Sequence, residues 1–131
     1  MKTFYTEDIK KTDRISRLVD NLYKKMPEIE AKRIIIFVGS HSKFSAELTA
    51  AVDTFCEKYN AVVVCDHTSN YKSNYRILGG IVERQVGNIE DCRKTDLLIH
   101  LGEVSGAYYI FEAADVWRVN PDGEIRDTFK K

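Results

Sequence analysis

Three short polar segments follow apolar stretches of this 131-residue chain and carry residue types that could bind a ligand. They are Gly39-Ser40-His41-Ser42, Asp66-His67-Thr68-Ser69-Asn70 and Gly102-Glu103-Val104-Ser105-Gly106. Glycine lets a backbone approach an anion closely, and a helix that begins after such a segment offers free N–H groups to a phosphate. The candidate ligand-contacting residues are therefore Gly39, Ser40, His41, Asp66, Gly102, Ser105 and Gly106.

The same residues have a purely structural interpretation, which the missing motifs favour. The chain contains neither G-x-G-x-x-G nor G-x-x-x-x-G-K-[ST], and it lacks the G-x-S-x-G turn of a serine nucleophile. In this interpretation the glycines form tight strand-to-helix turns and the hydroxyl groups cap helices. The sequence assigns no catalytic residue, no metal ligand and no established cofactor contact.

Histidine and cysteine side chains were the other candidates for chemistry. His41, His67 and His100 all map near the same strand ends, and with Asp66 they could form a metal or acid–base cluster. No ligand-spaced pair such as H-E-x-x-H occurs, so separate histidines with local partners are the favoured interpretation. The three cysteines have no zinc-ligand spacing and are expected to be reduced thiols of a cytoplasmic protein.

The elements that must position these residues follow from the apolar pattern. It predicts helices over 12–26, 45–59 and 105–114, strands over 33–39, 61–65, 97–102 and 116–119, and a turn over 120–123. The first ten residues are expected to be a polar lead-in. Within 71–93, residues 77–82 fit either a strand or a loop, and residues 83–92 fit a helix.

The alternation of these elements predicts an α/β fold, a three-layer Rossmann-like domain with a mostly parallel sheet. Residues 30–131 would form the domain, and the lead-in and helix of residues 1–29 would pack on it as one compact unit. Twenty basic residues balance twenty acidic ones, which gives no general attraction to nucleic acid or to an anionic membrane. The longest apolar run, Ile34 to Val38, is too short to span a bilayer.

Several segments, taken in order, resemble the central domain of thiamine-diphosphate-dependent enzymes. Among these enzymes the chain is most similar to the 2-succinyl-5-enolpyruvyl-6-hydroxy-3-cyclohexene-1-carboxylate synthase family of menaquinone biosynthesis. The tail motif Asp-Gly-Glu-x-x-Asp is the most specific part. The matching segments run from about residue 30 to the end: Arg33 to Ser42, Asp66 with Ser69-Asn70, Asp96 to Glu103, Ser105-Gly106 and Val116 to Asp127.

The resemblance implies a larger oligomeric parent enzyme, a transferase or lyase that decarboxylates 2-oxoglutarate and adds the product to isochorismate. In the family, thiamine diphosphate and Mg²⁺ lie between a pyrimidine-binding and a pyrophosphate-binding domain that flank the central one. The pyrophosphate motif Gly-Asp-Gly is absent here, because Asp122-Gly123 lacks the leading glycine. We therefore expect a non-catalytic structural domain that holds no cofactor itself.

Two further expectations accompany this assignment. Aromatic residues exposed in the isolated domain would mark former interfaces, with Tyr108, Tyr109, Phe111 and Trp117 as candidates and ordinary core packing as the alternative. The other function considered is a module that binds FAD or NAD, as some central domains of this fold do. In that case the three polar segments would form the site, and Asp66 is the acidic candidate to hold a ribose.

Overall fold

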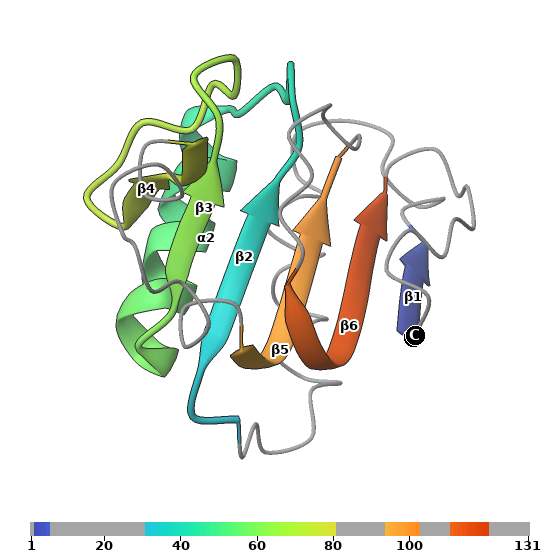
Figure 1. Ribbon diagram of the computed structural model, residues 1–131. Coiled ribbons are helices and arrows are strands. Elements are labelled where there is room, and N and C mark those ends of the chain that lie inside the picture. The colour runs from blue at the N-terminus through green and yellow to red at the C-terminus, as the bar shows by residue number, and fades with distance from the viewer. Residues whose placement is uncertain (1, 6–30, 81–93, 103–110, 121–131) are drawn as a thin grey trace.

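The computed structural model describes residues 2–5, 31–80, 94–102 and 111–120 (Figure 1). Its centre is a six-stranded sheet in the order β1-β6-β5-β2-β3-β4. Every pair of neighbouring strands is parallel, and the arrows of β1, β6, β5, β2 and β3 in Figure 1 point the same way. The elements are β1 (Lys2–Tyr5), β2 (Ile34–Val38), α2 (Ala46–Tyr59), β3 (Val62–Cys65), β4 (Arg76–Leu78), β5 (Lys94–Leu101) and β6 (Glu112–Asn120).

The strand order contains a topological switch point between β2 and β5. From β2 the chain adds β3 and then β4 on one side, and it later adds β5 and then β6 on the other side. In open parallel sheets of this Rossmann-like kind, ligands bind beyond the carboxyl ends of the two strands at the switch point. A ligand site is therefore expected at the edge of the sheet where β2 and β5 end.

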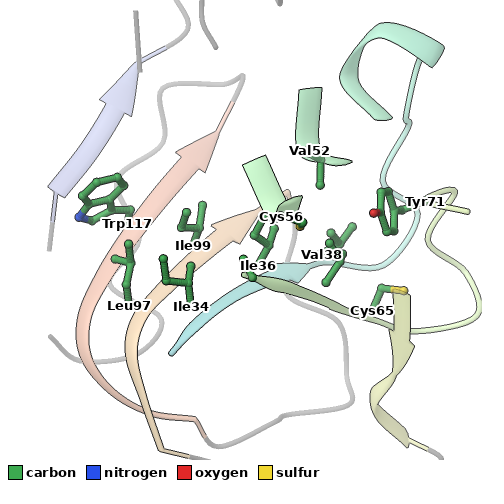
Figure 2. Close-up of a cluster of buried hydrophobic side chains, with 12 residues drawn as sticks. Ile34, Ile36, Val38, Val52, Cys56, Cys65, Tyr71, Leu97, Ile99 and Trp117 are labelled. Atoms are coloured by element: carbon green, nitrogen blue, oxygen red, sulfur yellow. The ribbon is translucent and has the colours of Figure 1, made fainter. Parts of the chain in front are cut away.

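Strand β2 is the central strand because its sequence can be buried on both faces. All five of its residues are buried, as expected for a β-branched and aromatic run that is covered on both faces. On one face, alternate residues such as Ile34, Ile36 and Val38 pack under α2 with Val52 and Cys56 (Figure 2). On the other face, Ile35 and Phe37 join a second buried cluster.

Helix α2 has the capping residues that its sequence predicts. The Ser45 hydroxyl accepts a hydrogen bond from the Leu48 N–H (3.1 Å) at the first turn. At the other end Asn60 takes the left-handed conformation (φ 51°), and its N–H donates to the carbonyl of Cys56. Among the described residues, no helix combines the length and apolar character that a membrane span needs.

The predicted helix over 105–114 is wrong in its last three residues, which belong to β6. Glu112 and Ala114 are exposed while Ala113 between them is buried, which is the period of two that a strand imposes. Glu112 pairs with Lys94 of β5, and β5 itself begins three residues before the predicted start of that strand. Short alternating runs are the ones that helix and strand periodicity separate least well.

Strand residues also occur in two segments where the sequence predicted none. Lys2–Tyr5, expected to be a lead-in, forms β1 and pairs with β6, and Asn120, assigned to a turn, is the last residue of β6. Of the ambiguous stretch at 77–82, Ile77 and Leu78 belong to β4, Gly79 and Gly80 are helical, and residues 81 and 82 lie outside the described part of the chain. The helices over 12–26 and 83–92, the turn at 121–123, and residues Cys92, Ser105 and Gly106 lie outside the described residues.

The aromatic candidates for an exposed interface pack into the interior where the structure describes them. Trp117 is 5% exposed and lies in the cluster under α2, so the core-packing alternative is confirmed for it (Figure 2). Phe111 is half-buried, and its ring lies 5.8 Å from that of Phe37. Tyr108 and Tyr109 lie outside the described residues. Cys56 and Cys65 are buried free thiols, as predicted.

Candidate functional site

Five of the seven candidate residues lie at the carboxyl edge of the sheet, in the turns that follow β2, β3 and β5. Gly39, Ser40 and His41 follow β2, Asp66 follows β3, and Gly102 follows β5. The structure joins two of these turns directly, since the Ser40 hydroxyl donates to Asp66 Oδ2 (2.8 Å). The His41 N–H also donates to the Thr68 hydroxyl (3.2 Å). The first two segments therefore contact each other, and of the third segment Gly102 is the one residue that the structure describes.

Asp66 is the centre of this edge, and its carboxylate holds its own turn together. Oδ1 accepts from the Thr68 N–H (2.8 Å), the Thr68 hydroxyl (2.7 Å) and the Ser69 N–H (3.0 Å). Burial on its own would raise the pKa of Asp66. The hydrogen bonds from Thr68, Ser40 and Ser69 outweigh that effect and hold the pKa below its usual range. The ionised Asp66 carboxylate therefore acts as a hydrogen-bond acceptor that stabilises its own turn, rather than as an acid or a base.

The hydrogen bonds of Asp66 bear on whether this edge can hold a ribose. Of the four donors from Ser40, Thr68 and Ser69, three bond to Oδ1 and one bonds to Oδ2. Oδ1 is therefore fully used, whereas Oδ2 keeps room for one further donor. The fold places Asp66 where the ribose-binding acid of a dinucleotide site stands, but most of the acceptor capacity of its carboxylate is used by the protein.

At the switch point, the turn that follows β2 contacts the end of β5 and the residue after it. The Gly39 N–H donates to the Leu101 carbonyl (2.9 Å), and the Ser42 hydroxyl donates to the Gly39 carbonyl (2.7 Å). Gly102 has a φ of +77°, and a Cβ built on it would lie only 2.7 Å from Ser42 Oγ. Ser42 therefore packs against the backbone of Gly102, at the point where ligands approach in related sheets.

Replacing Gly102 by alanine should lower the free energy of unfolding by about 1 to 2 kcal/mol, because the left-handed backbone strains any L side chain. The new methyl group would also push Ser42 aside. Urea unfolding of Gly102→Ala and of Gly102→Ala with Ser42→Gly separates the two effects. The double variant should recover the steric part only, and a Gly102→Ala protein as stable as the wild type would contradict the close packing.

The three histidines do not gather at this edge. His41 and His67 are exposed residues of the turns, whereas His100 is fully buried within β5 and hydrogen-bonded to Arg118. Within the ranges that the structure describes, no three His, Cys, Asp or Glu side chains are grouped so that they could hold a metal ion. His41 has a φ of 54°, a left-handed conformation that is uncommon outside glycine.

A second polar network, which was not predicted from the sequence, joins α2 to the segment that follows the Asp66 turn. Asp53 of α2 accepts from the Tyr71 hydroxyl (2.6 Å) and from the Ser73 hydroxyl (2.5 Å). Burial, together with the nearby charge of Asp53, raises the pKa of Cys56 to about 12, so this thiol stays protonated. The only sequence signal was Asp53 itself, an acidic residue one position from the buried Val52.

The hydrogen bonds around Asp66 could be predicted more readily from the sequence. Asp-x-Thr-Ser after a buried strand is typical of a turn in which the aspartate accepts from N–H groups two and three residues later. The packing role of Ser42 could not be predicted from the sequence, because its partner Gly102 lies sixty residues further along the chain.

Comparison with known proteins identifies no matching family model, no matching curated protein and no matching solved structure.

Proposed function

We propose that this chain is a non-catalytic structural domain, of the kind that forms the central domain of thiamine-diphosphate-dependent enzymes. In this proposal it fixes the spacing of a pyrimidine-binding and a pyrophosphate-binding domain, which hold thiamine diphosphate and Mg²⁺ between subunits of an oligomer. The reaction assigned to that parent is decarboxylation of 2-oxoglutarate and addition of the product to isochorismate. The sequence order from about residue 30 onward is the basis of this assignment.

The observation that carries the structural role is the closed carboxyl edge. A diphosphate needs free N–H donors or a cation at the end of a strand. Here the Gly39 N–H is bonded to Leu101, and the Thr68 and Ser69 N–H groups are bonded to Asp66. The first turn of α2 is capped by Ser45. These four N–H groups are therefore not available to thiamine diphosphate, which supports the structural role together with the missing Gly-Asp-Gly motif.

Calorimetric titration tests the structural role. Titration of the folded chain with thiamine diphosphate in the presence of Mg²⁺ should release no heat of binding, and the protein should not consume 2-oxoglutarate. Circular dichroism run on the same sample controls for folding. A stoichiometric complex with thiamine diphosphate, or turnover of 2-oxoglutarate by this chain alone, would refute the proposal.

A nucleotide-binding module is the second candidate, and one observation favours it. The order β4-β3-β2-β5-β6 has the same switch point as dinucleotide-binding sheets. If this function holds, the purified protein would carry the yellow absorption of FAD, or FAD, NAD or ADP would raise its melting temperature. The hydrogen bonds of Asp66 argue against it, because three of the four donors occupy Oδ1 and leave only Oδ2 with room for a ribose hydroxyl.

A further inference from the structure

An arginine and a histidine lie side by side in the interior, on the sheet face opposite α2. Arg118 of β6 is 1% exposed and His100 of β5 is 0% exposed. They are register partners, and Arg118 Nη1 lies 2.7 Å from His100 Nδ1. His100 is in turn the register partner of Phe37 in β2, and the two rings are 5.3 Å apart. These three residues form one row across the carboxyl half of the sheet.

The hydrogen bond fixes the protonation of the histidine. A guanidinium group only donates and stays protonated at all ordinary pH values. His100 Nδ1 must therefore accept from Arg118, which makes His100 a neutral imidazole with its proton on Nε2. The pair carries one positive charge in total, and that charge is on Arg118.

This charge has no counter-ion among the described residues. Among the residues that the structure describes, the hydrogen-bond partner of the Arg118 side chain is the neutral His100, and none of them accepts from its buried Nε–H. A buried charge is strongly unfavourable unless it is paired. The adjacent row on the same face is apolar, since Leu98 and Val116 are register partners with exposed fractions of 0% and 2%. The apolar surroundings strengthen the attraction of Arg118 for an anion.

We propose that Arg118, positioned by His100, binds the carboxylate of a small monoanionic organic acid. The guanidinium fork matches the two oxygens of a carboxylate, and a monoanion cancels the single positive charge. A phosphate dianion would leave a net negative charge in the interior. This site is separate from the closed turns at Asp66, because it lies within the strands and uses neither Asp66 nor Ser42.

Thermal unfolding tests the proposal when sodium acetate or butyrate replaces sodium chloride at constant ionic strength. The wild-type melting temperature should rise and then saturate, by about 10 °C at a hundredfold excess over Kd. Arg118→Met, which removes the charge but keeps the length, should abolish the rise. Arg33→Met, at an exposed arginine, should retain it. Sodium phosphate should have a smaller effect than either carboxylate.

A second measurement on the wild-type protein covers the case in which Arg118→Met does not fold. The Nε–H resonance of Arg118, assigned through its own backbone, should move saturably with acetate. The proposal is overturned if neither the melting temperature nor this resonance responds to carboxylate, or if Arg118→Met keeps the full response. A response to phosphate that equals the response to acetate would overturn the carboxylate assignment.

Discussion

Replacement of Tyr71 by alanine should lower the free energy of unfolding by about 4 kcal/mol, because it removes a fully buried aromatic side chain. Tyr71 is 0% exposed and packs in the cluster under α2 (Figure 2), and its ring lies 5.3 Å from that of Phe44. Its hydroxyl also donates to Asp53 (2.6 Å). The substitution would therefore leave a cavity and remove one of the two hydrogen bonds that join Asp53 of α2 to the segment after Asp66.

Tyr71→Phe is the matched control, since it keeps the ring and removes only the hydroxyl. Its expected cost is about 1.5 to 3 kcal/mol, the usual range for a hydrogen bond to a charged group. Ser73 still donates to Asp53 in this variant. Urea unfolding followed by circular dichroism measures both values. A Tyr71→Ala protein that loses less than Tyr71→Phe would show that the ring contributes no packing energy.

The second large effect is expected for Asp66→Ala, which should lower the free energy of unfolding by about 3 kcal/mol. The variant leaves four donors without their acceptor, from Ser40, Thr68 and Ser69. Ser69 is 3% exposed, so water cannot easily replace the lost acceptor there. Asp96→Ala is the control: Asp96 accepts from the N–H groups of Lys32 and Arg33 at an exposed position and should cost less.

The contribution of Asp66 should also depend on pH. Hydrogen bonds hold its folded-state pKa below the usual value of 3.8. Such a group stabilises the folded protein fully above the unfolded pKa, and the stabilisation is lost as the pH falls through the folded pKa. The stability difference between wild type and Asp66→Ala should thus be constant above about pH 5 and shrink below pH 4. A difference that grew on acidification would contradict the ionised state of Asp66.

The sheet centre could be predicted from sequence because burial dictates it locally. The run Ile34 to Val38 has no polar position, so only a central strand between two covered faces accommodates it. Ser45 and Asn60 likewise mark the ends of α2 through capping preferences that act within a few residues. Strand β1 was missed because its four residues gain stability from pairing with β6, more than a hundred residues away.

The candidate site could be predicted only in part, for the same reason. Residue types placed Gly39, Ser40 and Asp66 at one edge, but not the fact that they bond to one another. The closure at Ser42 and Gly102 and the anchoring of Tyr71 to Asp53 depend on contacts between distant segments. His100 was considered as a member of a metal cluster, and its buried partner Arg118 had no signal in the sequence beyond a charged residue within an apolar strand.

A residue-resolved titration of backbone amides by NMR tests whether any cofactor binds at the carboxyl edge of the sheet. Thiamine diphosphate with Mg²⁺, FAD and NAD are added separately to the ¹⁵N-labelled chain. We expect that the amide resonances of Gly39, Ser40, Thr68 and Gly102 do not move with any of them. Saturable shifts at these four amides with any one cofactor would contradict this expectation.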